Sequence, residues 1–178
     1  MIKKLVFLLM VVSLVFMVSP VQATETDFGY KVGDYELTLQ GSGASDKKFN
    51  NTAVSVEVGL GYFLTPMAEI GVRQGIGYIS TDDADNLWNG STRMFMDLNF
   101  DLGKVKPFIG ANLGYLYGDG VNETWIAGPE AGVKAFVSEN AFVYLMTEYN
   151  FTFDSTNEAD DAFDDGRFAY ALGLGINW

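Results

Sequence analysis

Residues 167–178 alternate between two kinds of side chain, and this alternation constrains the fold more than any other feature of the sequence. The even positions hold large apolar residues: Phe168, Tyr170, Leu172, Leu174, Ile176 and Trp178. The odd positions hold small or polar residues: Arg167, Ala169, Ala171, Gly173, Gly175 and Asn177. A period of two places the two sets on opposite faces of a β-strand. In a soluble protein the second face would be polar throughout, whereas Ala and Gly predominate here, which favours the crowded interior of a narrow barrel.

Seven further segments alternate in the same way between turn signals, so the sequence predicts eight strands. The expected ranges are 34–45, 52–64, 67–80, 91–102, 106–117, 124–137, 141–153 and 167–178. In the fourth segment, for example, Met94 and Met96 alternate with Arg93 and Asp97. Gln74 interrupts the apolar face of the third segment. No helical pattern of useful length follows the first 23 residues, which indicates an all-β protein.

The predicted connections alternate between short and long. Short connections are expected at 65–66, 103–105 and 138–140, and longer ones at 46–51, 81–90, 118–123 and 154–166. This alternation predicts an eight-stranded antiparallel up-and-down transmembrane β-barrel with short turns at one end and loops at the other. Because the number of strands is even, both termini are expected on the side of the short turns.

The first 23 residues have the layout of a secretory signal peptide. Lys3 and Lys4 precede an apolar run over residues 5–18, and the Val-Gln-Ala sequence at 21–23 supplies a small-residue cleavage site. The alternative is an uncleaved anchor, but the run is shorter than the roughly 18–20 apolar residues that a membrane span requires. We expect cleavage after Ala23 and a barrel domain over residues 24–178. No Cys follows the run, which excludes a lipoprotein anchor.

The distribution of apolar residues favours a membrane over water as the surroundings of the barrel. Apolar faces of about 9–11 residues per strand match the hydrocarbon thickness crossed at a tilt, and barrel closure pairs the backbone groups for which lipid offers no partner. Aromatic residues lie near the predicted strand ends, where membrane barrels carry interfacial girdles. The alternative is a secreted soluble barrel of the lipocalin type, with the apolar faces inside around a ligand. The many glycines opposite those faces argue against it.

The chain resembles the small eight-stranded outer-membrane barrels, the family of OmpX and of the OmpA transmembrane domain. The segments that carry the resemblance are 106–115 (KPFIGANLGY), 128–134 (GPEAGVK) and the last strand, which ends in Asn177 and Trp178. The resemblance implies a monomeric barrel in a Gram-negative outer membrane, in contact with its lipid and lipopolysaccharide, with both termini periplasmic. It also implies that Trp178 is part of the signal that the barrel-assembly machinery reads.

The chain contains no His and no Cys. This excludes Ser-His-Asp and Cys-His catalysis and the common zinc sites. The net charge of −12 and the lack of a basic cluster argue against nucleic acid as a partner. We therefore expect no enzymatic activity, no cofactor and no bound metal.

Seven charged residues are expected on the inner faces of the strands at similar heights: Glu57, Arg73, Arg93, Asp97, Glu130, Lys134 and Glu148. Buried charges of opposite sign are normally paired. The seven residues therefore predict one structural polar network that fills a lumen too narrow for solvent. The alternative is that two of the carboxylates act as a general acid and a general base.

The predicted loop at 154–166 is strongly acidic and contains no basic residue. Its carboxylates are Asp154, Glu158, Asp160, Asp161, Asp164 and Asp165. One interpretation is capture of a divalent cation in contact with lipopolysaccharide, although Phe163 interrupts an EF-hand spacing. A solvated acidic loop is the favoured alternative.

These patterns predict a barrel with a structural, envelope-stabilising or surface-interaction role and no catalysis, since a fold of this kind specifies architecture better than activity. The alternative function is a narrow porin-like pore or a small-ligand-binding barrel, which a lumen filled by side chains disfavours. Trp88 and Phe163 are the main apolar candidates for exposed loop contacts, and the partner of the loops stays open.

Overall fold

The computed structural model describes residues 28–45, 51–81, 84–119, 123–153 and 166–178. These residues form eight strands: β1 (Tyr35–Ser45), β2 (Asn51–Phe63), β3 (Ala68–Thr81), β4 (Ala84–Asn99), β5 (Val105–Gly118), β6 (Thr124–Phe136), β7 (Ala141–Phe153) and β8 (Arg167–Asn177). Among them no helix has the length and apolar character needed to cross a membrane. The predicted signal peptide at 1–23 and almost all of the acidic loop lie outside the described residues.

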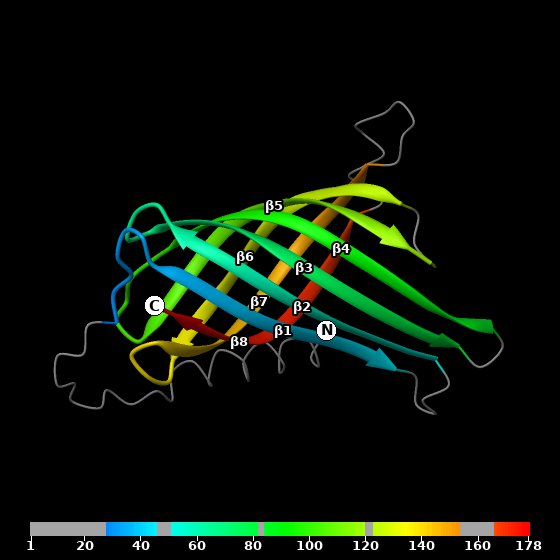
Figure 1. Cartoon of the computed structure of the whole chain (residues 1–178), viewed down its shortest axis with the longest axis horizontal. Helices are drawn as coiled ribbons and strands as arrows, with labels where there is room; N and C mark the ends of the chain where they lie inside the picture. Colours follow the sequence, from blue (N-terminus) through cyan, green and yellow to red (C-terminus); the bar gives the residue numbers. More distant parts are fainter. Residues whose placement is uncertain (1–27, 46–50, 82–83, 120–122, 154–165) are drawn as a thin grey trace, which may run out of the picture.

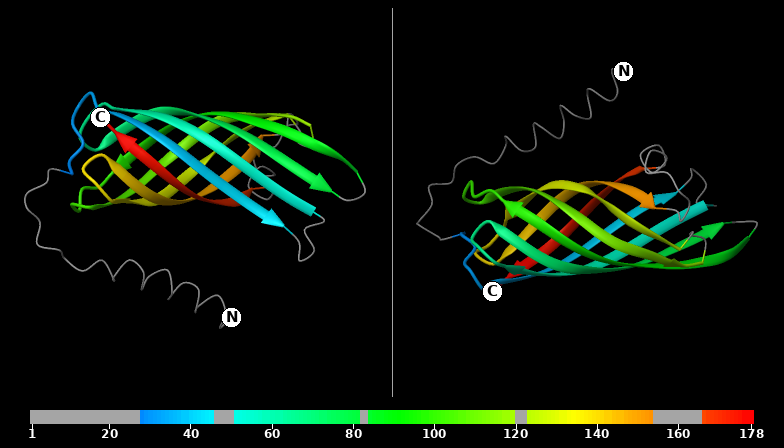
Figure 2. Two further views of the ribbon diagram at one scale, coloured as in Figure 1. Left: turned by 60° about the horizontal axis from the view of Figure 1, so that its bottom comes forward. Right: turned by 90° about the horizontal axis from the view of Figure 1, so that it is seen from above.

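The strands form one closed antiparallel barrel in which each strand pairs with its neighbours in sequence (Figures 1 and 2). β8 closes the barrel by pairing with β1, from Glu36 opposite Asn177 to Gly41 opposite Leu172. Beyond this ladder, the backbones of Tyr35 and Trp178 exchange two hydrogen bonds of 3.0 Å. The prediction of an eight-stranded up-and-down barrel, closed by the last strand on the first, is confirmed.

The short connections lie together at one end of the barrel, which we call the turn end, and the longer ones lie at the other, the loop end (Figure 1). Residues 64–67, 100–104 and 137–140 join β2 to β3, β4 to β5 and β6 to β7 at the turn end. Trp178 and the segment before β1 also lie at this end (Figure 2). The two ends of the described chain are therefore on the same side, as expected.

The prediction of a loop at residues 81–90 is wrong. Residues 81–90 belong almost entirely to a long hairpin, because β3 continues to Thr81 and β4 already begins at Ala84. The ladder continues through Tyr78, whose ring centroid lies 4.8 Å from that of Trp88, its cross-strand partner. The sequence of 81–90 indicates a loop, but cross-strand pairing extends the strands past the rest of the barrel (Figure 1). β4 also ends earlier than predicted, at Asn99.

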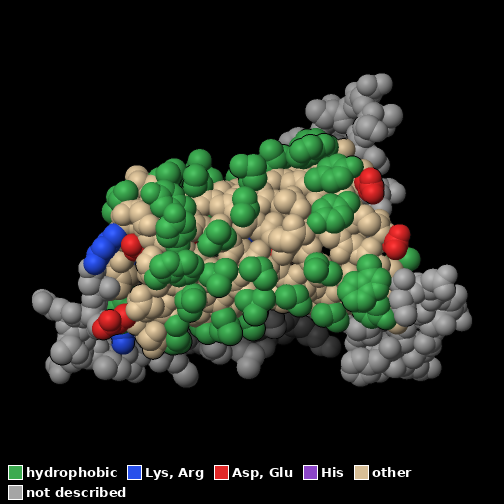
Figure 3. All heavy atoms as spheres, in the orientation of Figure 1, with side chains coloured by type: hydrophobic (Ala, Val, Ile, Leu, Met, Phe, Trp, Pro, Cys, Tyr) green, Lys and Arg blue, Asp and Glu red, His purple; other side chains and the backbone are tan. Residues whose placement is uncertain are grey.

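The apolar faces of the strands point outward, and the small and charged faces point into the lumen. On β2 the outward residues Val54, Val56 and Val58 are 46–48% exposed, whereas Glu57 between them is 7% exposed. On the face shown in Figure 3, hydrophobic side chains cover the middle of the barrel and charged side chains appear only toward its ends. This arrangement is the reverse of a lipocalin-type barrel, so the soluble alternative is excluded.

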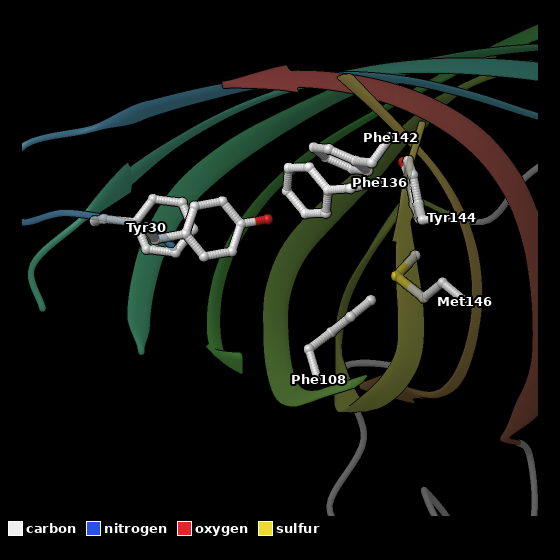
Figure 4. Close-up of a cluster of buried hydrophobic side chains, with 7 residues drawn as sticks. Tyr30, Phe108, Phe136, Phe142, Tyr144 and Met146 are labelled. Carbon is white, nitrogen blue, oxygen red and sulfur yellow. The ribbon is translucent and has the colours of Figure 1, made fainter. Parts of the chain in front are cut away.

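The lumen is packed with side chains, and its glycines make room for them. A Cβ atom added to Gly175 would lie 2.1 Å from the Phe142 ring, and one added to Gly61 would lie 1.9 Å from a carboxylate oxygen of Glu69. At the turn end, the lumen contains an apolar cluster drawn in Figure 4, made of Tyr30, Phe63, Phe108, Phe136, Phe142, Tyr144 and Met146. The glycines opposite the apolar faces therefore serve lumen packing, as the alternation predicted.

Candidate functional site

The candidate site is the set of charged side chains inside the barrel. All seven predicted residues point into the lumen and are buried, with exposed fractions of at most 8%. They come from five strands, because the alternation of each strand directs every second side chain inward. Their hydrogen bonds and ion pairs fall into two neighbouring clusters.

The first cluster, here the central cluster, comprises Glu57, Arg73, Arg93, Asp97, Asn112, Glu130 and Glu148. One half of it is built around Arg73 on β3. The Arg73 guanidinium donates two hydrogen bonds to Glu130 on β6, with Nη1–Oε2 and Nη2–Oε1 distances of 2.8 and 2.7 Å. It also lies 3.4 Å from Oδ2 of Asp97 on β4. The same guanidinium stacks on the Phe95 ring, 4.0 Å from its centroid. The bidentate ion pair between Arg73 and Glu130 fixes both side chains and spans the lumen.

The other half is built around Arg93 on β4. Its guanidinium lies 2.5 Å from Oε2 of Glu57 on β2 and 2.6 Å from Oε2 of Glu148 on β7. Asn112 on β5 connects the halves, because its Nδ2 donates to Glu130 at 2.9 Å and to Glu148 at 3.4 Å. The central cluster thus links β2, β3, β4, β5, β6 and β7 across the lumen.

The second cluster, here the turn-end cluster, surrounds Lys134 on β6 and comprises Tyr30, Glu36, Glu69, Asn99 and Lys134. Lys134 Nζ lies 2.7 Å from Oε1 of Glu36 and 3.0 Å from Oε2 of Glu69. The Asn99 amide donates a hydrogen bond of 3.2 Å to Glu69. The ammonium group also lies 5.4 Å from the centroids of the Phe108 and Phe142 rings. Aromatic faces and two carboxylates together compensate for the loss of water around this lysine.

Tyr30 closes the turn-end cluster from the segment that precedes β1. Its hydroxyl donates a hydrogen bond of 2.9 Å to Glu36, and its ring stacks on Phe63 with a centroid distance of 3.8 Å. Burial raises the pKa of the Tyr30 hydroxyl well above its usual range, so it stays a proton donor. The chain before the first strand therefore places Tyr30 among the buried side chains at the turn end of the lumen (Figure 4).

Whether the seven residues act as a single network stays a prediction, and their direct contacts are uneven. Six of the residues lie in the central cluster, and Lys134 is paired in the turn-end cluster instead. The alternation reports only whether a side chain points inward, whereas its height depends on the stagger of the strands around the barrel. The inward phase of Glu36 and Glu69 could have marked them as candidates, but no sequence signal indicated Tyr30, which lies outside the strands.

The arrangement joins strands across the lumen, and the carboxylates of the central cluster are engaged by arginines. Glu57, Glu130 and Glu148 each accept charged hydrogen bonds from an arginine, which leaves none of the three as a free base. Within the described ranges, no group of three or more acidic side chains is arranged to hold a metal ion. The acidic loop, for which a cation was considered, lies outside those ranges apart from Gly166.

Comparisons with known proteins find similarity at the level of structure. No family model matches the chain, and no curated protein sequence matches it significantly. The N-terminal β-barrel domain of Pseudomonas aeruginosa OprF has a TM-score of 0.59 at 18% identity, covering 84% of this chain and 99% of that one. The outer membrane protein OprG of the same organism has a TM-score of 0.56 at 10% identity, with coverages of 85% and 98%. Neisserial surface protein A has a TM-score of 0.53 at 16% identity, with coverages of 81% and 94%.

Proposed function

We propose that this chain, which has the fold of the small eight-stranded outer-membrane barrels, is an outer-membrane protein with a structural, envelope-stabilising role. The observation that carries the proposal is the combination of an apolar exterior with a lumen crossed by buried ion pairs. An apolar outer surface is stable in lipid, and ion pairs that cross the lumen make the barrel more rigid.

The membrane location is supported by the outer surface of the barrel. Aromatic side chains gather where interfacial girdles are expected. At the turn end, the Tyr35 ring lies 5.1 Å from that of Tyr62 and 5.9 Å from that of Trp178. At the loop end, the Tyr115 and Trp125 rings lie 5.4 Å apart. Apolar residues on each strand fill the space between the two aromatic groups.

A structural role is favoured over a pore because the lumen is obstructed at two heights. The central cluster crosses it with the Arg73–Glu130 and Arg93–Glu148 pairs, and the apolar cluster with Tyr30 fills it at the turn end. Ions would have to displace paired charges that are themselves desolvated, which is costly. Both obstructions support a structural role over that of a water-filled pore.

Single-channel recording in planar bilayers tests this role directly. The folded protein is expected to give no steady conductance, and a variant carrying Tyr30→Ala, Arg73→Ala and Arg93→Ala is expected to open short conducting events. Reproducible steady conductance from the unaltered protein would replace the structural role with that of a narrow pore.

The expected orientation places the turn end in the periplasm and the loop end outside the cell. Because the chain has no Cys, single cysteines can report this orientation. A membrane-impermeant thiol reagent applied to intact cells should label Asp119→Cys, near the loop end, and should leave Ser138→Cys, at the turn end, unlabelled until the outer membrane is permeabilised. The reverse pattern would contradict the orientation.

Trp178 is proposed as part of the assembly signal. Trp178 is 57% exposed, and its backbone exchanges hydrogen bonds with that of Tyr35. Trp178→Ala should lower the amount of folded barrel in the outer membrane of cells while leaving refolding of the purified protein into detergent nearly unchanged. Equal losses in both assays would indicate a stability role instead.

A further inference from the structure

Three polar side chains contact one another on the outer face of the barrel: Gln74 on β3, Thr92 on β4 and Tyr117 on β5. All three are exposed. Gln74, which interrupts the apolar face of its strand, donates a hydrogen bond of 2.7 Å from Nε2 to the Tyr117 hydroxyl. Its Oε1 accepts one of 2.8 Å from Thr92 Oγ1, which lies 3.4 Å from the Tyr117 hydroxyl. We call these three side chains the outer polar ring.

The outer polar ring lies within the apolar band of the wall. On β3, Gln74 is midway between Ile70, which is opposite Tyr62, and Tyr78, which is opposite Trp88. Tyr62 and Trp88 mark the aromatic levels at the turn end and at the loop end. A polar side chain between these levels is costly unless it is hydrogen-bonded, because lipid offers no partner. Such an intramembrane polar group is therefore a candidate binding site.

Tyr117 directs its hydroxyl from the loop-end level into the apolar band. It is opposite Gly90 on β4, and its ring covers this glycine so closely that an added Cβ atom would lie 2.4 Å from Tyr117 Cε2. Gly90 is in turn opposite Ile76, so the contact with Gln74 turns the hydroxyl toward the turn end. The polar atoms of the ring thus lie between the middle of the band and its loop-end edge.

The hydrogen bonds of the ring use all of its donors and leave acceptors. Gln74 Nε2 donates its second hydrogen to the Gly75 carbonyl at 3.2 Å. Thr92 gives its one proton to Gln74, so the Tyr117 hydroxyl is the donor in its contact with Thr92. Amide and hydroxyl oxygens have two acceptor positions each. Gln74 Oε1 and Thr92 Oγ1 therefore each keep one position that only a hydrogen-bond donor can occupy.

This pattern of donors and acceptors limits the partner. A phosphate group only accepts hydrogen bonds, and a second copy that met this one ring to ring would offer acceptors alone. An ammonium group would donate, but it would carry a charge into the apolar band. A hydroxyl group on an acyl chain donates, is uncharged and is brought to this depth by the lipid itself.

An apolar recess of about 550 Å³ continues from the ring toward the turn end. Its lining includes Val72 and Met94, which are the next outward residues after Gln74 and Thr92 on the same strands. An acyl chain that enters from the loop end therefore passes the ring first and then reaches the recess.

We propose that the outer polar ring and this recess bind an acyl chain that carries a hydroxyl group near its head. The hydroxyl donates to Gln74 Oε1, and the rest of the chain lies along Val72 and Met94. In the orientation proposed above the loop end faces outward, so the lipid is lipopolysaccharide, whose acyl chains are hydroxylated at carbon 3. The site rests on that membrane location and orientation, but not on the structural role.

The experiment uses the full barrel, isotope-labelled and folded in nanodiscs of deuterated phosphatidylcholine. 3-Hydroxytetradecanoic acid is added while the Gln74 side-chain amide and the backbone amides of Thr92 and Met94 are followed by NMR. We expect saturable shifts at these residues. Tetradecanoic acid should bind about fivefold more weakly, the effect of losing one hydrogen bond. Equal affinity of the two acids would overturn the site.

3-Methoxytetradecanoic acid tests the direction of the hydrogen bond, because its ether oxygen accepts but cannot donate. It should bind as weakly as tetradecanoic acid, and binding as tight as that of the hydroxy acid would overturn the donor assignment. Ala131, in a second outward recess of about 610 Å³, reports general partitioning into lipid. Its amide should respond equally to all three acids, and saturation there by the hydroxy acid alone would show that the ring does not select the chain.

Variants of the ring test its two acceptors. Gln74→Leu and Thr92→Val should each lose the preference for the hydroxy acid. The matched control is Thr147→Val, the same change in the second recess, which should keep it. Tyr117→Phe frees a hydrogen of Gln74 Nε2 and should raise the affinity for the methoxy acid. A preference retained in both Gln74→Leu and Thr92→Val would overturn the proposal.

Lipopolysaccharide added to the nanodiscs tests the occupant. It should shift the Thr92 and Met94 amides of the unaltered protein and leave those of Gln74→Leu in place. Binding of the hydroxy acid without an effect of lipopolysaccharide would overturn the choice of lipid. The spectrum recorded before any addition separates this site from the membrane location. A chain without a dispersed barrel spectrum in nanodiscs contradicts both proposals, whereas a folded barrel without hydroxyl-dependent binding contradicts only this one.

Discussion

Arg73 and Glu130 are 57 residues apart in sequence and join β3 to β6 across the lumen through two hydrogen bonds of 2.8 and 2.7 Å. Neither strand pairs with the other in the sheet, so this ion pair adds a connection that the barrel ladder does not contain. Both side chains are almost fully buried. The pair therefore restrains the cross-section of the barrel, and its removal should lower the stability of the whole domain.

Double-mutant cycles should separate direct from indirect coupling in the central cluster. Glu130→Gln and Arg73→Gln should each destabilise the barrel by about 3–5 kcal/mol, because each leaves a buried charge without its partner. Their coupling energy should be about 2 kcal/mol or more, within the range for residues in direct contact. Glu130→Gln with Arg93→Gln should couple less, since Asn112 lies between them. Denaturant unfolding in lipid vesicles measures these values, and additive losses for Arg73 and Glu130 would contradict the network.

Lys134→Met should be strongly destabilising, by about 3–5 kcal/mol, because Glu36 and Glu69 would remain buried without their cation. Adding Glu36→Gln and Glu69→Gln to this variant should restore much of the lost stability, since three neutral side chains replace the charged group. The measurement is the denaturant midpoint of the folded barrel. If the triple variant is less stable than Lys134→Met alone, the turn-end cluster contributes through something other than charge compensation.

Leu172→Arg tests the lipid-facing side of β8. An arginine there should cost roughly 2–4 kcal/mol if the position lies near the middle of the bilayer. Ala171→Ser is the matched control, because residue 171 faces the lumen and a hydroxyl is tolerated there. Equilibrium unfolding from vesicles compares the two variants. A Leu172→Arg barrel as stable as the unaltered protein would indicate that this face contacts water.

Asp101, in the turn between β4 and β5, should make stability depend on pH. The hydrogen bond from Lys106 Nζ, at 2.7 Å, and a second from the Gly103 amide hold the pKa of the Asp101 carboxyl below its ordinary value. A folded-state pKa that is depressed adds stability above the unfolded pKa of about 3.9, and this contribution is lost as the pH falls through the folded pKa. Asp101→Asn should remove that part of the acid dependence.

The Asp101 prediction is checked in two ways. Carboxyl NMR titration should show Asp101 titrating below the ordinary aspartate range. Unfolding curves of the unaltered protein and of Asp101→Asn should converge as the pH falls to the folded pKa. The Lys106→Met variant should return the Asp101 pKa toward its ordinary value, and an unchanged pKa in that variant would show that Lys106 is not the cause.

Much of the barrel could be predicted because the alternation of a strand is a local property. In β8, Leu172 and Leu174 had to point opposite to Gly173, whatever the rest of the chain does. The same argument placed all seven predicted charges on the inner face. It failed at residues 81–90, where the polar sequence resembles a loop and only the cross-strand pairing of Tyr78 with Trp88 extends the hairpin.

The sequence by itself determined the number of strands, the face on which each side chain lies and the closure of the last strand on the first. Only the tertiary structure decided which inward charges meet: Lys134 with Glu36 and Glu69, and Arg73 with Glu130. It also decided that Tyr30 enters the lumen and that the pairing of β1 with β8 stops at Gly41 and Leu172. Facing direction follows from a period of two along one strand. Height and contact across the lumen depend on the stagger accumulated around all eight strands.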